Sequence, residues 1–198
     1  MSDLKNTRPI TLLETLRKIL IKILTNRISQ TCTNSGILKG DNFLVLKDTS
    51  TATPIHIVNF LIEHTTNHKK KLWLVSQDMK KAYDSVGTDQ LLLALKRINM
   101  HPKYIELIQN IQQNHTNSVQ TFFGPTDEYS VQDGLDQGEV NVPIHWRIFY
   151  DPLLAEIKRL SKKNGYKINT KWTQINRPKE QMEMKNFFTG YAFMDNTL

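Results

Sequence analysis

The chain has 198 residues and carries a net charge of +7, with 26 Lys and Arg against 19 Asp and Glu. This length provides one domain or slightly more, and the basic charge favours a polyanionic partner. Cys32 is the only cysteine, which excludes an internal disulfide and indicates a reducing, intracellular compartment. Without a signal peptide or an apolar run near the roughly 20 residues of a membrane span, we expect a soluble protein.

The N-terminal region predicts two helices. Apolar residues at helical spacing indicate an amphipathic helix over residues 12–28, opened by a capping box at Thr11–Glu14. The polar stretch 31–53 predicts a loop, and Thr53-Pro54 predicts the start of the next helix. That helix is expected to turn four apolar residues inward: Ile57, Val58, Leu61 and Ile62.

Two histidines, His64 and His68, lie four residues apart on the second helix. Such a pair can bind a metal, but no third ligand is evident and Lys69–Lys71 would repel a cation. We therefore expect surface histidines.

Two apolar runs each end on a carboxylate. The run from Leu72 to Val75 predicts a short buried strand that leads to Asp78. A second strand-like run, from Phe187 to Met194, leads to Asp195. If the two strands are neighbours, their carboxylates form an acidic pair that can bind divalent cations.

Between these runs the pattern predicts further helices and a hairpin. Two helices are expected around 91–98 and 102–111, and two strands at 118–123 and 128–131 are separated by Gly124-Pro125. A helix over 144–160 contains Pro152, which should kink it or divide it in two. These elements predict an α+β layer fold.

A basic stretch follows. Residues 158–185 contain nine Lys and Arg against two Glu, so they carry +7, as much as the whole chain. A solvated loop and a nucleic-acid contact both fit this composition.

Four motifs follow one another along nearly the whole chain: Arg8-Pro9-Ile10, Asp78 to Asp84 with Ser85-Val86, Gly134-Leu135-Asp136-Gln137-Gly138 with Pro143, and Tyr191-Ala192-Phe193-Met194-Asp195-Asn196. In order and spacing they resemble the motifs of reverse transcriptases of non-LTR (LINE-type) retrotransposons. Group II intron enzymes share much of the pattern.

The resemblance implies a right-hand polymerase palm with partial fingers, an antiparallel sheet packed on helices, fingers at 1–70 and palm at 71–198. It implies an RNA-directed DNA polymerase that adds nucleotides by two-metal phosphoryl transfer. The implied partners are an RNA template, a DNA primer and dNTPs, and the cofactors are two Mg²⁺ ions, with Mn²⁺ as a substitute. The compartment would be intracellular, the nucleus included.

The resemblance also assigns residue roles. Asp78 and Asp195 would be the catalytic, metal-bridging carboxylates, and Asn196 would be a third metal ligand. Five residues would bind the nucleotide: Arg8, Met79, Tyr83, Gln137 and Gly138. Tyr83 matches the aromatic residue that disfavours ribonucleotides. Its alternative role is ordinary core packing, and both roles can hold together.

Departures from the family pattern predict weak or absent activity. Asn196 stands where the family usually has a second Asp, so metal affinity should fall. Asn141-Val142-Pro143 replaces the usual Ser-Pro after Gln-Gly. We also expect a palm truncated in the metal-motif hairpin, without the family's return strand and thumb, and this truncation should impair activity.

Three alternatives stay open. The chain could be an inert nucleic-acid-binding remnant of a retrotransposon, held by its basic stretch. The acidic pair could serve a nuclease or another phosphotransferase, although hydrolysis requires neither Tyr83 nor the Gln137-Gly138 loop. The third alternative is a translated fragment without a cellular role.

Overall fold

The computed structural model divides into two compact units. It describes residues 10–43, 50, 52–113, 115–131, 134–136, 138–174, 177–190, 192–193 and 196–197. Unit 1 comprises residues 1–37, 45–47 and 79–150, and unit 2 comprises 38–44, 48–78 and 151–198. The predicted division into 1–70 and 71–198 stays a prediction.

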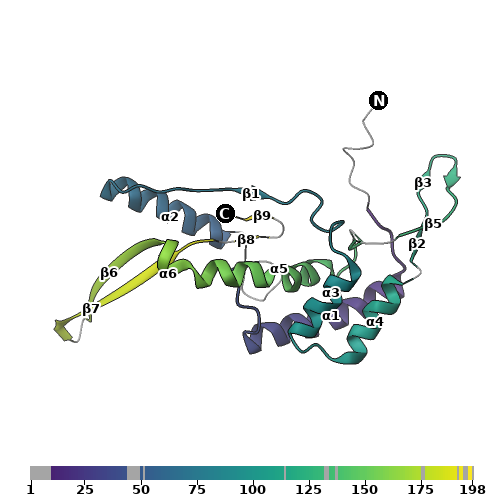
Figure 1. Cartoon of the computed structure of the whole chain (residues 1–198), viewed down its shortest axis with the longest axis horizontal. Helices are drawn as coiled ribbons and strands as arrows, with labels where there is room; N and C mark the ends of the chain where they lie inside the picture. The colour runs from purple at the N-terminus through teal and green to yellow at the C-terminus, as the bar shows by residue number, and fades with distance from the viewer. Residues whose placement is uncertain are drawn as a thin grey trace. The chain divides into compact units, whose positions relative to one another are not determined.

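Helices and antiparallel strands make up both units (Figure 1), which confirms the mixed class of the fold. The helices are α1 (Thr15–Ser35), α2 (Ala52–His68), α3 (Thr88–Arg97), α4 (Pro102–Gln112), α5 (Val142–Arg159) and α6 (Ser161–Asn164). The strands are β1 (Gln77–Asp78), β2 (Thr116–Asn117), β3 (Gln120–Thr121), β4 (Gly124–Pro125), β5 (Tyr129–Ser130), β6 (Tyr166–Gln174), β7 (Arg177–Phe188), β8 (Ala192–Phe193) and β9 (Asn196–Thr197). None of the helices in the described part of the chain combines the length and apolar character that a membrane crossing requires.

The first helix begins later than its sequence suggests. The predicted capping box is wrong: α1 starts at Thr15, and Glu14 at the N-cap makes no side-chain cap bond. The Thr11 hydroxyl instead donates to Asp136 Oδ1 over 3.5 Å, so a long-range contact replaces the local one.

The end of α1 also corrects a prediction. Residues 31–35 were expected in a loop, but they form the last turns of the helix. The hydroxyls of Thr31, Thr33 and Ser35 each donate to a carbonyl four residues earlier, which satisfies polar side chains inside a helix. The helix then ends at Gly36, whose φ of 55° suits a left-handed C-cap.

Only part of the apolar surface of α1 is covered. The buried positions form one stripe: Ile21, Thr25, Ile28 and Cys32. Several apolar residues of the predicted helix 12–28 are exposed, namely Leu12, Leu16, Ile19, Leu20 and Ile23. The spacing identified a helix correctly, but its packing neighbours determine which face is buried.

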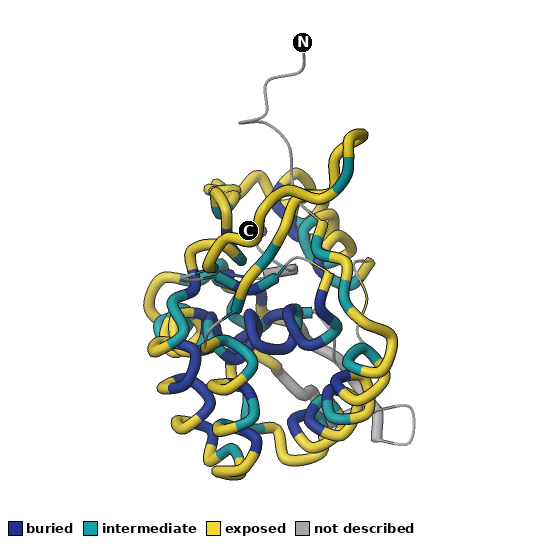
Figure 2. Tube along the Cα trace, turned by 90° about the vertical axis from the view of Figure 1, so that its right-hand side faces the viewer, coloured by how far each residue is buried: buried dark blue, intermediate teal, exposed yellow. Residues whose placement is uncertain are grey.

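The following helices of unit 1 agree with prediction. The α3 helix ends just before Asn99, which takes a φ of 55°, and the His101 side chain caps α4 by accepting from the Lys103 amide at 3.2 Å. Apolar side chains of α3 and α4 join the early part of α5 in the core; examples are Leu91, Leu95, Ile108, Ile144, Trp146 and Ile148. Buried positions lie mostly on helices (Figure 2).

One unbroken helix, α5, passes through Pro152, so the predicted division into two helices is wrong. A proline lacks the N–H that would bond the carbonyl four residues earlier, here Ile148. The Arg97 guanidinium donates to that carbonyl at 3.1 Å. This bond satisfies the acceptor that Pro152 leaves open.

The predicted hairpin of unit 1 is present but turns earlier than expected. In it, β3 pairs with β4 through Thr121 and Gly124, so the turn is Phe122-Phe123 rather than Gly124-Pro125. Farther from the turn, β2 pairs with β5. Phe122 and Phe123 are fully exposed.

In unit 2, α2 contains Pro54 in its first turn, as predicted, although the helix begins one residue before Thr53. Leu61 is buried, but the predicted inward position Ile62 is exposed. Gly40, from the segment expected to be a loop, donates its N–H to Asp151 Oδ1 at 2.8 Å. A side chain there would collide with Leu154, so the close approach requires glycine.

Both apolar runs that lead to the predicted acidic pair differ from expectation. Residues 71–76 form no strand, and Trp73, Leu74 and Val75 are exposed, so the predicted buried strand is reduced to Gln77–Asp78. The run from Phe187 is also divided: β7 ends at Phe188 and β8 begins at Ala192. A buried strand must be covered on both faces. In the described part of the chain, the two-residue β1 pairs only with β9 and lies at the edge of its sheet, so the predicted buried strand does not form.

The basic stretch is largely ordered, which removes the solvated-loop interpretation for most of its length. Strands β6 and β7 form a two-stranded antiparallel ribbon from Tyr166–Phe188 to Gln174–Arg177 (Figure 1). Ile168 is buried, whereas Lys167 and Lys185 are exposed.

Candidate functional site

The predicted metal-binding motifs meet in a small sheet of unit 2. The strand order is β1-β9-β8, and β1 pairs antiparallel with β9 so that Asp78 lies opposite Asn196. Next to it, Phe193 of β8 also pairs with Asn196. The sheet thus brings together two residues separated by more than half of the chain, and Asp78 is exposed at its surface.

Several predicted site residues lie outside the described residues. Arg8, Gln137 and Asp195 belong to this group, so their places in the predicted site stay predictions.

Two residues paired in this sheet, Asp78 and Asn196, are of types that carry hard oxygen donors. Asp78 offers a carboxylate, and an asparagine such as Asn196 offers an amide oxygen; both donor types suit Mg²⁺. Within the described ranges, no cluster of three or more His, Cys, Asp or Glu residues is arranged for a metal. The magnesium site therefore stays a prediction.

The turn that follows Asp78 in sequence belongs to unit 1. It contains Met79, half-buried, and Lys81 with a φ of 53°. Buried Ala82 and Val86 anchor the turn in the core. Tyr83 packs edge-on against Trp146, with ring centroids 5.9 Å apart, so the core-packing interpretation of Tyr83 is confirmed.

The glycine loop of residues 134–138 is attached to this turn by backbone hydrogen bonds. Gly134 N–H donates to the Val86 carbonyl at 3.1 Å, and Leu135 N–H donates to the Tyr83 carbonyl at 2.9 Å. Gly134 has a φ of 108°, and an added Cβ would lie 3.2 Å from the Asp84 Cα. Two motifs predicted to form one site are therefore joined directly.

Gly138 makes the second close approach of the loop. Its φ is 126°, and a Cβ added there would lie 2.7 Å from the Thr11 carbonyl oxygen. Glycine is thus required both by the backbone conformation and by the space available.

Two acidic side chains on either side of Gln137-Gly138 hold the loop in place. Arg17 binds both carboxylate oxygens of Glu139, at 3.0 and 3.1 Å. The side chain of Glu139 is only 6% exposed, which makes this bidentate pair the strongest fixed charge contact of the loop. On the other side, His115 Nε2 lies 3.1 Å from Asp136 Oδ2.

Sequence reasoning missed these partners. Asp136 lies inside a quoted motif, but Arg17 and His115 are distant in sequence and belong to no motif. The available signal was the acidic pair Asp136 and Glu139 in a basic chain, since carboxylates that become buried require donors.

A buried polar pair lies in the same unit. The Tyr104 hydroxyl is 2.8 Å from His145 Nε2, and both residues are buried. Burial lowers the pKa of His145 from 6.5 to about 4, and it raises the pKa of Tyr104. Burial thus keeps His145 neutral near pH 7, and its neutral imidazole can accept the hydrogen bond from Tyr104.

Comparison with known proteins connects this arrangement to one family. The reverse transcriptase (RNA-dependent DNA polymerase) family model matches residues 2–192. The "Probable RNA-directed DNA polymerase from transposon BS" of Drosophila melanogaster is 25% identical over 72% of the chain.

Two further relatives are retrotransposon polyproteins. The "Retrovirus-related Pol polyprotein from type-2 retrotransposable element R2DM" of Drosophila melanogaster is 22% identical over 76% of the chain. The corresponding polyprotein of type-1 element R2 from Popillia japonica is 23% identical over 77%. The chain spans only 14% to 21% of the length of these three relatives.

Proposed function

Because this chain belongs to the reverse transcriptase (RNA-dependent DNA polymerase) family, we propose that it is part of the palm and fingers of an RNA-directed DNA polymerase. Its substrates would be dNTPs, added to a DNA primer on an RNA template. The pairing of Asp78 with Asn196 across β1 and β9 carries the proposal. Opposed residues of antiparallel strands have Cα atoms about 4.5 to 5.5 Å apart, close enough for a shared ion.

The metal ligands of the proposed site are Asp78, Asp195 and Asn196. Asp195 is bonded to Asn196, the residue that pairs with Asp78. The chemistry that Mg²⁺ supplies at such a site is neutralisation of the triphosphate and activation of the primer hydroxyl.

The nucleotide would contact residues of the second motif and the turn after Asp78. In this proposal the Tyr83 ring limits the space at the sugar 2′ position, and the backbone at Met79 faces the triphosphate. Gly138 permits close backbone approach, while Gln137 and Arg8 contact the nucleotide from the loop and the fingers. The fixed position of Tyr83 against Trp146 supports the role of Tyr83, because a discriminating ring must resist displacement.

We expect polymerase activity to be weak. Asn196 provides an oxygen but no negative charge, so the site binds divalent cations less tightly than a site with three carboxylates. Since the chain spans about a fifth or less of its relatives, the proposal concerns one domain of such an enzyme.

Primer extension on an RNA template with Mg²⁺ or Mn²⁺ tests the proposal. Asn196→Asp should increase the extension rate at low Mg²⁺, and Asp78→Asn should abolish extension in both backgrounds. As a matched control, Asp127→Asn removes an exposed carboxylate of unit 1 and should leave the rate unchanged. Extension that persists after Asp78→Asn would contradict the proposed site.

The exposed lysines of the basic stretch favour one second candidate, an inert nucleic-acid-binding remnant. Among the described side chains they are Lys158, Lys162, Lys163, Lys167 and Lys185. This candidate predicts salt-sensitive binding that survives Asp78→Asn, together with no extension by the wild-type chain. Extension by the wild-type chain that Asp78→Asn abolishes would exclude it.

A further inference from the structure

Helix α1 has a second apolar stripe on the side that faces away from the core of unit 1. This outer stripe comprises Leu16, Ile19, Leu20 and Ile23. Leu16 is 79% exposed, and the other three residues are 47% to 52% exposed. At 3.6 residues per turn, the outer stripe lies on the opposite side of the helix from the buried stripe, which comprises Ile21, Thr25, Ile28 and Cys32. A contiguous exposed patch of aliphatic side chains indicates a surface that binds a partner.

The spacing of the outer stripe is that of a seam between two packed helices. Its residues follow one another at i, i+3, i+4 and i+7, the pattern by which one helix packs against another. With Leu16 at position a of a heptad, Ile19 occupies position d and Ile23 the next position a. The outer stripe therefore matches the apolar stripe of a second amphipathic helix.

The charges beside the outer stripe are all positive. Helix α1 contains four basic residues and no acidic residue. Arg17 is paired with Glu139, whereas neither Lys22 nor Arg27 forms an ion pair with another described residue. In the heptad, Lys22 occupies position g and Arg27 the next position e, where charges select the partner of a helix. A helix with acidic side chains at its own e and g positions would complement both.

The same features disfavour two other occupants. A second copy of this chain would bring its own Lys22 and Arg27 to the seam, and like charges at these positions repel. A helix that lies on a membrane combines one apolar face with a polar face in water. Helix α1 instead has apolar stripes on opposite sides, and one of them is buried in unit 1.

We propose that the outer stripe of α1 docks an acidic amphipathic helix of a partner protein. In this complex, the Leu and Ile side chains of the outer stripe interdigitate with the apolar stripe of the partner helix, while Lys22 and Arg27 pair with its carboxylates. The outer stripe spans about two helical turns, so the interface belongs to the small, transient class. None of its residues belongs to the proposed polymerase site, so the proposal is independent of polymerase activity.

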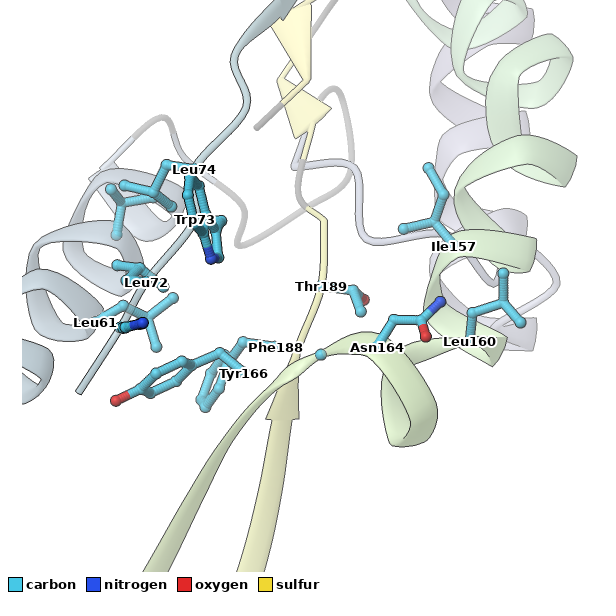
Figure 3. Close-up of a pocket in the computed structure, with 13 residues that line it drawn as sticks. Leu61, Leu72, Trp73, Leu74, Ile157, Leu160, Asn164, Tyr166, Phe188 and Thr189 are labelled. Atoms are coloured by element: carbon cyan, nitrogen blue, oxygen red, sulfur yellow. The ribbon is translucent and has the colours of Figure 1, made fainter.

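A second apolar surface provides a specificity control. A cavity of about 520 Å³ lies wholly within unit 2. In Figure 3, Leu72 and Trp73 line one wall of this cavity, and Asn164 lies opposite. A peptide that binds any apolar surface would also enter this cavity. Trp73→Ala therefore serves as a control, because it removes an 89% exposed ring from the cavity wall and leaves α1 unchanged.

The test is titration of a fluorescein-labelled synthetic peptide, followed by fluorescence anisotropy in EDTA without nucleotides. The peptide is an amphipathic helix with Leu at positions a and d and Glu at positions e and g, so repulsion between its own carboxylates keeps it monomeric. The wild-type chain should bind this Glu peptide. Leu16→Gln should lower the affinity about 10-fold or more, as expected when an exposed leucine becomes buried on binding. The matched control, Leu93→Gln, removes a similarly exposed leucine from α3 of unit 1 and should leave the affinity unchanged.

Charge exchange tests the pairing. Replacing Lys22 and Arg27 together with Glu should weaken binding of the Glu peptide and create binding of a peptide that carries Lys at positions e and g. The control is the same replacement at Lys96 and Lys103, which are exposed on α3 and α4 and bring the same change in net charge. This control should still prefer the Glu peptide. Equal responses of the two variants would refute the pairing.

Four further results would overturn the proposal. The first is absence of binding of the Glu peptide to the wild-type chain, and the second is equal loss of affinity in the Leu16→Gln and Leu93→Gln variants. The third is loss of binding in the Trp73→Ala variant without loss in the Leu16→Gln variant, which would place the peptide in the cavity. The fourth is self-association, or binding to vesicles of phosphatidylserine and phosphatidylcholine, that Leu16→Gln abolishes while the Glu peptide fails to bind; it would assign the outer stripe to a second copy or to a membrane.

Discussion

Acid should destabilise unit 1 through a single buried histidine. The pKa of His145 is about 4 in the folded chain, against 6.5 when it is exposed. Because the folded value is the lower one, the unfolded chain binds the proton first. The stability that neutral His145 provides is complete above pH 6.5 and is lost as the pH falls toward 4.

The size of the effect follows from the shift. At about 1.4 kcal/mol per pKa unit, the full shift corresponds to about 3 kcal/mol, of which about 2 kcal/mol is lost between pH 7.5 and 5. This loss is a large fraction of the 5 to 15 kcal/mol typical of small domains.

Urea unfolding at several pH values between 7.5 and 5, followed by circular dichroism, measures the effect. His145→Gln is the control, because glutamine can still accept the hydrogen bond of Tyr104 but does not titrate. The wild-type chain should lose about 2 kcal/mol more than the variant over this range. Equal losses would refute the assignment of acid sensitivity to His145.

Three further predictions concern contacts that position the loop and α5. Gly138→Ala should lower the free energy of unfolding, measured in urea, by about 1 to 3 kcal/mol, since alanine is strained at a φ of 126° and meets the Thr11 carbonyl. An unchanged urea midpoint would contradict this prediction. Arg97→Ala should lower the free energy of unfolding by about 1.5 to 3 kcal/mol. The loss should be much smaller in a Pro152→Ala background, because alanine restores the missing N–H. Equal losses in both backgrounds would show that the guanidinium does not compensate for the proline. Arg17→Ala should lower the free energy of unfolding by about 2 to 3 kcal/mol, because it leaves Glu139 buried and unpaired. Adding Glu139→Gln to the same chain should recover part of this loss. Strictly additive effects of the two substitutions would exclude the coupling.

Local chemistry was sufficient to predict several elements of the fold. Asn99 ends α3 and His101-Pro102 opens α4 through bonds within a few residues, so their signals do not depend on the rest of the chain. The hairpin was also predictable, although its turn was misplaced because Gly124 serves in the return strand.

The motifs of the site could be found in the same way, but their surroundings could not. Arg17 lies in an ordinary basic helix, and His115 lies in no pattern, yet both bind carboxylates of the glycine loop. Long-range ion pairs leave no periodic trace in the sequence, because each partner is selected by position in space.

By itself, the sequence determined the family, the order of the motifs and most of the helices, since these depend on residue identity and short spacing. Only the tertiary structure decided that Asp78 pairs with Asn196, and that Trp73 faces solvent where its apolar run predicted burial. Burial and strand pairing depend on which distant segments cover a residue, and that information is absent from any local stretch of the chain.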